Sequence, residues 1–494
     1  MAHGKNSLVG VDLDGSRARA VSGPAGGLPQ PLPLDGPGEE LPLAVSLEGR
    51  HPAAGRAGLA LCRKLPHLAC LDFLAHLGTG REWSGGRHRL DAGRALAVLF
   101  DHLPPAVAAA RGVAFAVPAY LDPAQTSLLL AVAAKSRLPA RGAVAIPVAL
   151  ALAAYADQPW RGAVCVVDAD DHALTWSALW PEGGEMRLAE TQVIPALAVR
   201  LWKERLLDLA ADRCVRQTRR DPRDCPDAEQ SLYEQIDAAW DAARQGNLAE
   251  LVVQTPQWYQ NVVLRPAEVA GCCAGFVGRA VEGLHALHAA VGQPGAVLVS
   301  ASAARLPGLV GALEAALAEL VPANDPAAEE DFGEGLVDDG FAPPLVSVLP
   351  PDAAARAAHG LAARWAQGEL PAGPQGAAPL LPAQSADAGP PRLHFRGQDY
   401  PIRGAAFTLG RHAGCDLVFD SEQYPAVSAR HCEIVFDRGA YVLLDRSRNG
   451  TLVNERPVVQ QIALHPGDWV RLGPQGPLLR FLGQALGQRK LTTA

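Results

Sequence analysis

Short alternating segments separated by turn residues fill residues 392–486, and they constrain the fold more than any other feature of the chain. Five of them are clear: Arg392 to Phe395, Ala405 to Leu409, Cys432 to Phe436, Tyr441 to Leu444 and Val470 to Leu472. Each is bounded by Gly, Pro, Asp or Asn. Period-two runs with closely spaced turns predict an all-β sandwich. In such a fold the strands form the scaffold, and loops at one end carry the site.

Polar and cationic residues lie in three of the predicted loops. Arg411 begins one loop, Ser428 lies in a second, and Asn449 lies in a third. A guanidinium fork suits a phosphate, a serine hydroxyl adds a donor, and an asparagine amide can hold the main chain of a peptide. Arg430 and Arg448 add positive charge. Because neither paired carboxylates nor a Cys-His pair accompany these residues, we expect a phosphopeptide-binding site and no catalytic set.

Three blocks of this region follow one another in a specific order: Gly410-Arg411, then Ser428-x-x-His431, then Asn449-Gly450-Thr451-x-x-Asn454. This order resembles the forkhead-associated (FHA) domain, a family of eleven-stranded β-sandwiches that bind phosphothreonine peptides. The resemblance covers about the last fifth of the chain. It implies that Arg411 and Ser428 bind the phosphate and that Asn449 holds the peptide backbone. It also implies a loop-shaping role for Gly410, His431, Gly450, Thr451 and Asn454.

Two positions depart from the usual family pattern. Ala429 and Arg448 stand where other members often carry polar residues, which affects the fine geometry of the expected pocket. The alternative interpretation is a sandwich that binds no phosphate, in which Arg411 is only a surface ion-pair partner.

Length and composition bound the rest of the protein. The chain has 494 residues, of which 49% are hydrophobic, and a formal charge of -8, which predicts a soluble protein of two to four globular domains. The mild acidity argues against a nucleic-acid partner. No apolar run has the length of a signal or membrane-spanning segment, so we expect a cytoplasmic protein without a membrane partner. The nine cysteines form no CxxC pair, so we expect neither a metal site nor a disulfide framework.

Strand-like and helix-like segments alternate before residue 370. Strands are predicted near Leu8 to Leu13, Gly112 to Val117, Gly162 to Asp168 and Gly295 to Ser300, and helices after Asp122, over Leu197 to Leu251 and over Pro350 to Gln367. Asp122 followed by Pro123 is typical of a helix start. Strand pairs that alternate with helices predict an α/β fold.

Several phrases of this region resemble, in order, the nucleotide-binding domain of DnaK-type heat-shock chaperones, within the actin-like ATPase superfamily. They are Gly10 to Ser16, Val117-Pro118-Ala119-Tyr120, Pro147 to Tyr155, Val164 to Asp168, Val297 to Pro307 and Pro351 to Gly360. The match spans about residues 6–370. It implies an actin-like domain whose first and second phosphate loops follow Asp12 and Asp168.

The departures from that family concern the nucleotide site. Asp14 stands where a small residue should approach phosphate oxygens, and the second loop continues with Asp170 and Asp171 in place of glycines. Like charges at close range repel, and lost glycines block close backbone approach. Serine and alanine also replace the glycine pair of the adenosine segment, at residues 300–301, and the expected lysine near residue 74 is a leucine.

These departures predict a degenerate ATPase that does not hydrolyse ATP. A vestigial site of Asp12, Ser16 and Asp168 would bind ATP and magnesium weakly at most, and we expect no required cofactor. Under the alternative interpretation, Asp12 and Asp168 are only turn residues at strand ends.

Residues 371–391 are rich in Pro, Ala and Gly, which predicts a structureless linker. The sequence therefore favours a phosphothreonine-binding adaptor in Ser/Thr-kinase signalling: a degenerate actin-like domain over 6–370, a linker over 371–391 and an FHA domain over 392–486. Its partners would be phosphothreonine proteins, among them a Ser/Thr kinase or its substrates. Two alternatives remain: an ATP-dependent chaperone-like switch that gates the FHA domain, and a structural assembly protein in which neither site is active.

Overall fold

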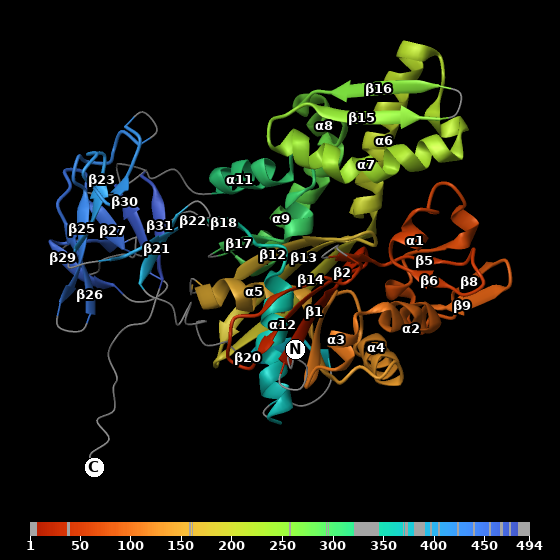
Figure 1. Ribbon diagram of the computed structural model, residues 1–494, viewed down its shortest axis with the longest axis horizontal. Helices are drawn as coiled ribbons and strands as arrows, with labels where there is room; N and C mark the ends of the chain where they lie inside the picture. Colours follow the sequence, from red (N-terminus) through yellow and green to blue (C-terminus); the bar gives the residue numbers. More distant parts are fainter. Residues whose placement is uncertain are drawn as a thin grey trace. The chain divides into compact units, whose positions relative to one another are not determined.

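The computed structural model describes residues 7 to 482 with gaps. The described residues are 7–36, 40–157, 160, 162–255, 258–292, 294, 296–320, 345–368, 370, 374–379, 391–395, 398–403, 406–421, 424–437, 440–453, 456–464, 468–473 and 476–482. The chain forms two compact units (Figure 1). The first comprises residues 1–155 and 159–381, and the second comprises residues 382–494 with the segment 156–158.

The first of two mixed sheets in the larger unit has β1 at its centre. The strand order is β19-β11-β10-β1-β2-β3, and β4 also pairs with β2. Its strands are β1 (Ser7–Leu13), β2 (Arg17–Pro24), β3 (Gln30–Leu32), β4 (Glu40–Pro42), β10 (Gly112–Val117), β11 (Ala140–Ala145) and β19 (Pro374–Gln375). β1 pairs with β2 in antiparallel and with β10 in parallel orientation.

The second mixed sheet has β12 in the corresponding place. Its strand order is β18-β17-β12-β13-β14-β20. Its strands are β12 (Val164–Ala169), β13 (Leu174–Glu182), β14 (Glu185–Ile194), β17 (Ala296–Val299), β18 (Leu345–Val348) and β20 (Ala377–Pro379). β12 pairs with β13 in antiparallel and with β17 in parallel orientation.

The two sheets repeat one topology. In each, three antiparallel strands are extended by two parallel strands, and a helix connects the two parallel strands: α4 (Pro123–Lys135) in the first sheet and α11 (Leu309–Leu320) in the second. A further helix then follows, α5 (Ile146–Asp157) or α12 (Ala353–Ala366). The turns β1–β2 and β12–β13 are therefore equivalent positions. This α/β region with two mixed sheets is consistent with the expected actin-like fold.

Helices α5 and α12 share one hydrophobic core with residues of both sheets. On β1, Leu8 belongs to this core, whereas Val9 and Val11 belong to the core on the opposite face. Gly10 permits the close approach of α12, because a Cβ atom there would lie 2.0 Å from the Ala355 carbonyl oxygen.

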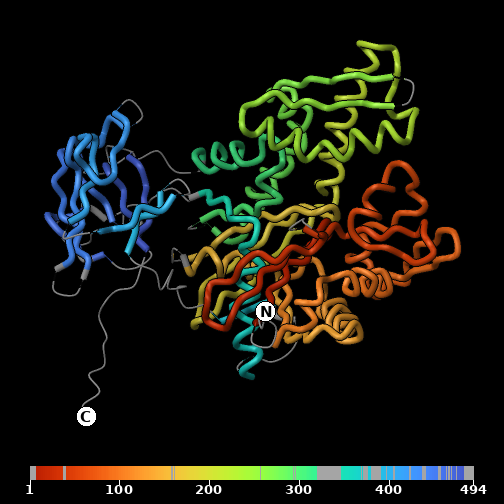
Figure 2. The backbone as a smooth tube through the Cα atoms, in the orientation of Figure 1, coloured from red at the N-terminus to blue at the C-terminus, as the bar shows by residue number. Residues whose placement is uncertain are grey.

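Two segments are inserted between strands of the large sheets, the first between β4 and β10 and the second between β14 and β17 (Figure 2). The first contains β5 (Val45–Ser46), β6 (Ala53–Ala54), α1 (Arg56–Leu59), η1 (Pro66–Leu68), β7 (Ala69–Cys70), η2 (Leu74–His76), β8 (Glu82–Gly85), β9 (His88–Asp91), α2 (Ala92–His102) and α3 (Pro105–Ala108). The second contains η3 (Pro195–Leu197), α6 (Val199–Thr218), η4 (Pro222–Asp224), α7 (Pro226–Arg244), β15 (Ala249–Gln254), β16 (Tyr259–Leu264), α8 (Pro266–Cys272) and α9 (Ala274–Val291), and α10 (Ala301–Ala304) follows β17.

The second insertion differs from the continuous helical segment expected over residues 197–251. α6 ends because Arg219 adopts a left-handed conformation with φ of 62°. The chain then forms a second helix and enters a hairpin at Ala249. By contrast, α4 begins as predicted, with Asp122 and Gln125 forming a capping box and Pro123 in the first turn.

Within residues 374–379, the expected linker forms strands. Residues 374–375 form β19, which pairs with β11, and residues 377–379 form β20, which pairs with β14. These short strands add one strand to the edge of each large sheet, so this part of 371–391 belongs to the larger unit.

The smaller unit consists of two sheets around one core. Their strand orders are β22-β21-β31-β30-β27-β28 and β24-β23-β25-β26-β29, eleven strands among the described residues. The strands are β21 (Arg392–Phe395), β22 (Gln398–Pro401), β23 (Ala406–Gly410), β24 (Leu417–Val418), β25 (Cys432–Asp437), β26 (Ala440–Asp445), β27 (Thr451–Val453), β28 (Arg456–Pro457), β29 (Gln461–Leu464), β30 (Trp469–Leu472) and β31 (Leu478–Leu482). The predicted β-sandwich is confirmed.

Within the part of the chain that the structure describes, no helix has both the length and the apolar character needed to cross a membrane.

Candidate functional site

Three loops of the sandwich meet at Ser428. Arg411 directly follows β23, and its backbone N–H donates to the Ser428 carbonyl oxygen at 3.1 Å. From the loop between β26 and β27, the backbone N–H of Arg448 donates to Ser428 Oγ at 3.2 Å. In the same loop, Asn449 Nδ2 donates to the carbonyl oxygen of Ala426 at 2.8 Å. The structure therefore brings together the residues that the sequence assigned to the phosphate and to the peptide backbone.

The His431 side chain connects the loop of Ser428 with the loop of Gly450. The side chain is fully buried. Its Nδ1 accepts a hydrogen bond from the Ser428 N–H at 3.0 Å, and its Nε2 lies 3.2 Å from the Gly450 carbonyl oxygen. Because a backbone N–H can only donate, Nδ1 is unprotonated and Nε2 donates. Burial lowers the pKa of His431, so the ring stays neutral and keeps this arrangement.

Two glycines set the backbone of the site. A Cβ atom at Gly410 would lie 2.3 Å from the Ala429 carbonyl oxygen, so the end of β23 can lie this close to that loop only because residue 410 is glycine. Gly450 has φ of 78°, a left-handed conformation that glycine adopts without strain.

Asp445 supports the third loop, although the sequence did not single it out. Its Oδ1 accepts hydrogen bonds from Thr451 Oγ1 at 2.8 Å and from the Ser447 N–H at 3.0 Å. Burial alone would raise the pKa of Asp445, but these hydrogen bonds outweigh burial and lower it. An aspartate two residues before a turn N–H is a signal that could have identified it. Asn454 lies outside the described residues.

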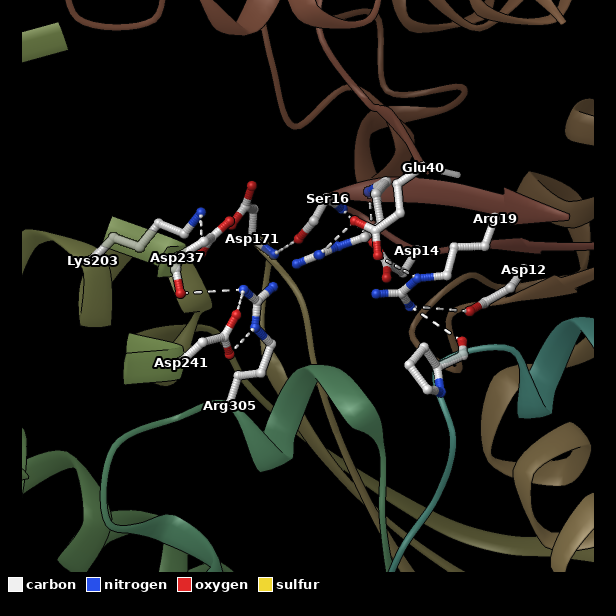
Figure 3. A network of polar contacts seen from close by, with 12 residues as sticks. Asp12, Asp14, Ser16, Arg19, Glu40, Asp171, Lys203, Asp237, Asp241 and Arg305 are labelled. Carbon is white, nitrogen blue, oxygen red and sulfur yellow. Dashed lines mark hydrogen bonds and ion pairs between the residues drawn. The ribbon is translucent and has the colours of Figure 1, made fainter. Parts of the chain in front are cut away.

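A second polar cluster lies where the β1–β2 and β12–β13 turns of the larger unit meet (Figure 3). Asp14 Oδ1 accepts the N–H groups of Ser16 and Arg17 at 2.6 and 2.7 Å. In the equivalent turn, Asp170 Oδ1 accepts the N–H groups of His172 and Ala173, both at 2.9 Å. Each turn therefore encloses a carboxylate from its own sequence.

The two turns are also bonded to each other. The Gly15 N–H donates to Asp170 Oδ2 at 2.7 Å, and the Asp171 N–H donates to Ser16 Oγ at 2.8 Å. The hydroxyl of Tyr120 donates to Asp170 Oδ2 at 2.7 Å, a contact that the sequence did not predict. Tyr120 is the last residue of the Val117–Tyr120 phrase, so the resemblance singled out the residue but not its contact with Asp170.

Burial raises the pKa of the carboxylates in this cluster. It raises the pKa of Asp14, Asp168 and Asp170 to about 6 each. The pKa of Asp12 is raised well above its usual value by burial and by the neighbouring charge of Asp14. Asp12 Oδ1 is buried and has no hydrogen-bond partner. The described residues contain no group of His, Cys, Asp and Glu side chains arranged to hold a metal ion.

The cations around this cluster are already paired with carboxylates. Their ion pairs are Arg17 and Arg19 with Glu40, Lys203 with Asp237, and Arg305 with Asp241 (Figure 3). The cavity lined by Asp12, Asp168 and Ser300 has a volume of about 20 Å³, which is room for roughly one water molecule. A nucleoside triphosphate needs free turn N–H groups, unpaired cations and space. Here the N–H groups and the cations are engaged and the cavity is small, so these residues do not fit ATP in this conformation.

Side chains also join the two inserted segments directly. The buried Gln230 of α7 accepts the Arg63 N–H at 2.8 Å and donates to the Leu59 carbonyl oxygen at 3.0 Å. The Arg63 guanidinium pairs with Glu204 and, at 3.5 Å, with Glu229. The segments are thus held together by the chain's own side chains.

The comparisons with known proteins concern the smaller unit. The family model "FHA domain" matches residues 407–473. The human E3 ubiquitin-protein ligase CHFR is 41% identical over 75 residues, which is 14% of this chain and 11% of that protein. The mouse protein of the same name is 41% identical over 70 residues, 13% of this chain and 10% of its own length. The chain thus spans about a tenth of the length of these curated relatives. No family is assigned to the larger unit, whereas residues 407–473 form an FHA domain, which implies binding of phosphothreonine peptides.

Proposed function

We propose that this protein is an adaptor or scaffold that recruits phosphothreonine-containing proteins in Ser/Thr-kinase signalling. The observation that carries this proposal is the meeting of Arg411, Ser428 and Asn449 on hydrogen-bonded loops at one end of the sandwich. A phosphate adds about -1.5 to -2 charges and three strong acceptors, which match a guanidinium and a hydroxyl. The likeness to the CHFR proteins concerns this segment alone, so ubiquitin ligation is not part of the proposal.

The direct test is calorimetric titration of the whole protein with one peptide in phosphorylated and unphosphorylated forms. We expect binding of the phosphothreonine peptide only. Equal binding of both forms would contradict the proposed function.

Phosphothreonine should also bind more tightly than phosphoserine in otherwise identical peptides. The resemblance to the FHA family implies a small apolar niche for the threonine methyl group, and one methyl group in such a niche contributes roughly 1–3 kcal/mol. The same titration should therefore give an affinity at least about fivefold higher for phosphothreonine. Equal affinities would mean that Ala429 or Arg448 has removed the niche while phosphate binding remains.

The larger unit, in this proposal, is a scaffold without ATPase activity. Three observations support it: Asp14 and Asp170 occupy the turn N–H groups, the nearby cations are paired, and the cavity beside Asp12 is small. The contacts between Gln230 and Arg63 hold the inserted segments together without a nucleotide. The alternative is an ATP-gated switch, for which the retained Asp12 and Asp168 are the supporting observation.

A ligand that binds the native state raises the melting temperature by mass action. Because the larger unit is proposed not to bind ATP appreciably, ATP with magnesium should leave the melting temperature of the protein unchanged. A thermal-shift assay in wild type and in Asp12→Ala checks this expectation. A magnesium-dependent rise that disappears in Asp12→Ala would favour the ATP-gated switch.

A further inference from the structure

Four exposed arginines surround Ser428, and we call them the arginine rim. The rim consists of Arg411, Arg430, Arg446 and Arg448. Backbone hydrogen bonds fix their proximity, since Arg411 and Arg448 are bonded to Ser428, and the Arg446 N–H donates to the His431 carbonyl oxygen at 2.9 Å. Arg430 lies between Ser428 and His431 in the chain. The four exposed arginines therefore lie on backbone segments that are close together around the loops of the FHA site.

Two carboxylates that are close to rim residues in the sequence are engaged elsewhere. Asp445 accepts hydrogen bonds from Thr451 and Ser447, and Asp416 accepts them from the N–H and hydroxyl groups of Thr408. Among the residues that the structure describes, no carboxylate lies within ion-pair distance of a rim arginine. The positive charge of the rim is thus available to a ligand.

One phosphothreonine does not neutralise this surface. The rim carries four positive charges, and a phosphate at neutral pH carries about -1.5 to -2. About two positive charges therefore remain next to the phosphate site. We infer that the preferred partner of this FHA domain is a peptide segment in which acidic residues, either Asp and Glu or a second phosphorylated residue, flank the phosphothreonine.

This inference rests on the proposed function, because the flanking acids would bind beside the same phosphate. A peptide is the favoured polyanion because Ser428 and Asn449 offer a hydroxyl and an amide beside the cations. Arg446 gives the sharpest test, since it lies on the rim but outside the residues assigned to the phosphate. Its backbone N–H makes the hydrogen bond to the His431 carbonyl oxygen, so a serine there keeps that bond.

The experiment titrates the whole protein, by fluorescence anisotropy, with three phosphothreonine peptides that differ only in their flanks: neutral, aspartate-containing or lysine-containing. Exposed ion pairs are weak individually, so two of them should give about threefold to tenfold tighter binding of the acidic peptide than of the neutral one. The lysine peptide should bind more weakly than the neutral one. The preference should shrink as salt increases, because salt screens exposed charges. A peptide with a second phosphoserine in place of the aspartates separates the two sources of negative charge.

In Arg446→Ser, the ratio of acidic to neutral affinity should fall about twofold to fivefold. Arg403→Ser is the matched control, because Arg403 is exposed and precedes β23 at the end opposite to Arg411. Phosphate-dependent binding with no effect of the flanks would overturn the inference alone. No dependence on phosphate in the neutral peptide would overturn the proposed function and the inference together. A short single-stranded RNA that displaces the acidic peptide and loses affinity in Arg446→Ser would overturn the assignment to peptides.

Discussion

An Arg411→Ala variant should bind a phosphothreonine peptide tenfold to a hundredfold more weakly than the wild-type protein. Hydrogen bonds to charged groups contribute about 1.5–3 kcal/mol each, and Arg411 is an exposed residue directly after β23 whose backbone is bonded to Ser428. Its backbone N–H, which joins the loop to Ser428, is unchanged by the substitution. The loss should therefore appear in affinity, measured by calorimetry, and not in folding.

Two further variants separate charge from geometry. Arg411→Lys keeps the charge but loses the planar fork that matches phosphate oxygens, so its affinity should lie between those of wild type and Arg411→Ala. Arg403→Ala removes an exposed arginine from the other end of β23 and should bind as wild type does. If Arg411→Ala binds the phosphopeptide as tightly as wild type, Arg411 is only a surface residue and the phosphate lies elsewhere.

The FHA site could be predicted from the sequence because its chemistry lies in short contiguous blocks. Gly410-Arg411 and Asn449-Gly450 each carry a side chain that the resemblance assigns to the ligand, together with a glycine whose geometry the loop requires. The sandwich then brings the blocks together, as the bonds to Ser428 show. The turn signal of Asp445 lies in its bond to the Ser447 N–H, whereas its bond to Thr451, six residues later, leaves no pattern in the sequence.

Tertiary pairing decided the features of the larger unit that the sequence did not predict. Residues 374–379 are rich in Pro, Gly and Ala, which locally favour a linker, but they become edge strands because β11 and β14 offer unpaired edges. Proline is tolerated on edge strands. The left-handed Arg219 ends α6 without a glycine or proline at that position. The pairing of residues 374–379 does not depend on local preference, so composition could not show it.

The β1–β2 and β12–β13 turns, which resemble phosphate-binding loops, differ from the sequence prediction in the role of their carboxylates. The sequence predicted that Asp14 and Asp170 would repel a phosphate. In the structure these carboxylates also accept the N–H groups of their own turns, so each occupies the donors that an anion would use. Sequence could show which residues were present, but not that each carboxylate folds back onto its own backbone.

The charge on Asp14 should therefore cost stability, and Asp14→Asn should raise the free energy of unfolding of the larger unit by about 1–3 kcal/mol at pH 7.5. Burial raises the pKa of Asp14 from 3.8 to about 6, and each unit corresponds to about 1.4 kcal/mol. The carbonyl oxygen of asparagine can still accept the Ser16 and Arg17 N–H groups that Asp14 Oδ1 accepts. The substitution thus removes the charge and keeps the turn.

The pH dependence identifies the cause of this stabilisation. A group whose folded pKa is raised stabilises the fold below its unfolded pKa, and that contribution is lost as the pH rises through the folded pKa. The advantage of Asp14→Asn should therefore be full above pH 7, shrink through pH 6 and nearly vanish by about pH 4. Denaturation followed by tryptophan fluorescence reports mainly the larger unit, because Trp469 is the only one of nine tryptophans beyond residue 381.

Asp101→Asn is the matched control, because Asp101 is exposed on α2 and should change stability little at any pH. A lower stability of Asp14→Asn at pH 7.5 would contradict the prediction. It would mean that the negative charge is needed in the folded protein, either by Arg17 and Arg19 or by a bound cation. The second cause can be recognised, because magnesium would then stabilise wild type but not Asp14→Asn, and the ATP-gated switch would become the better account of the larger unit.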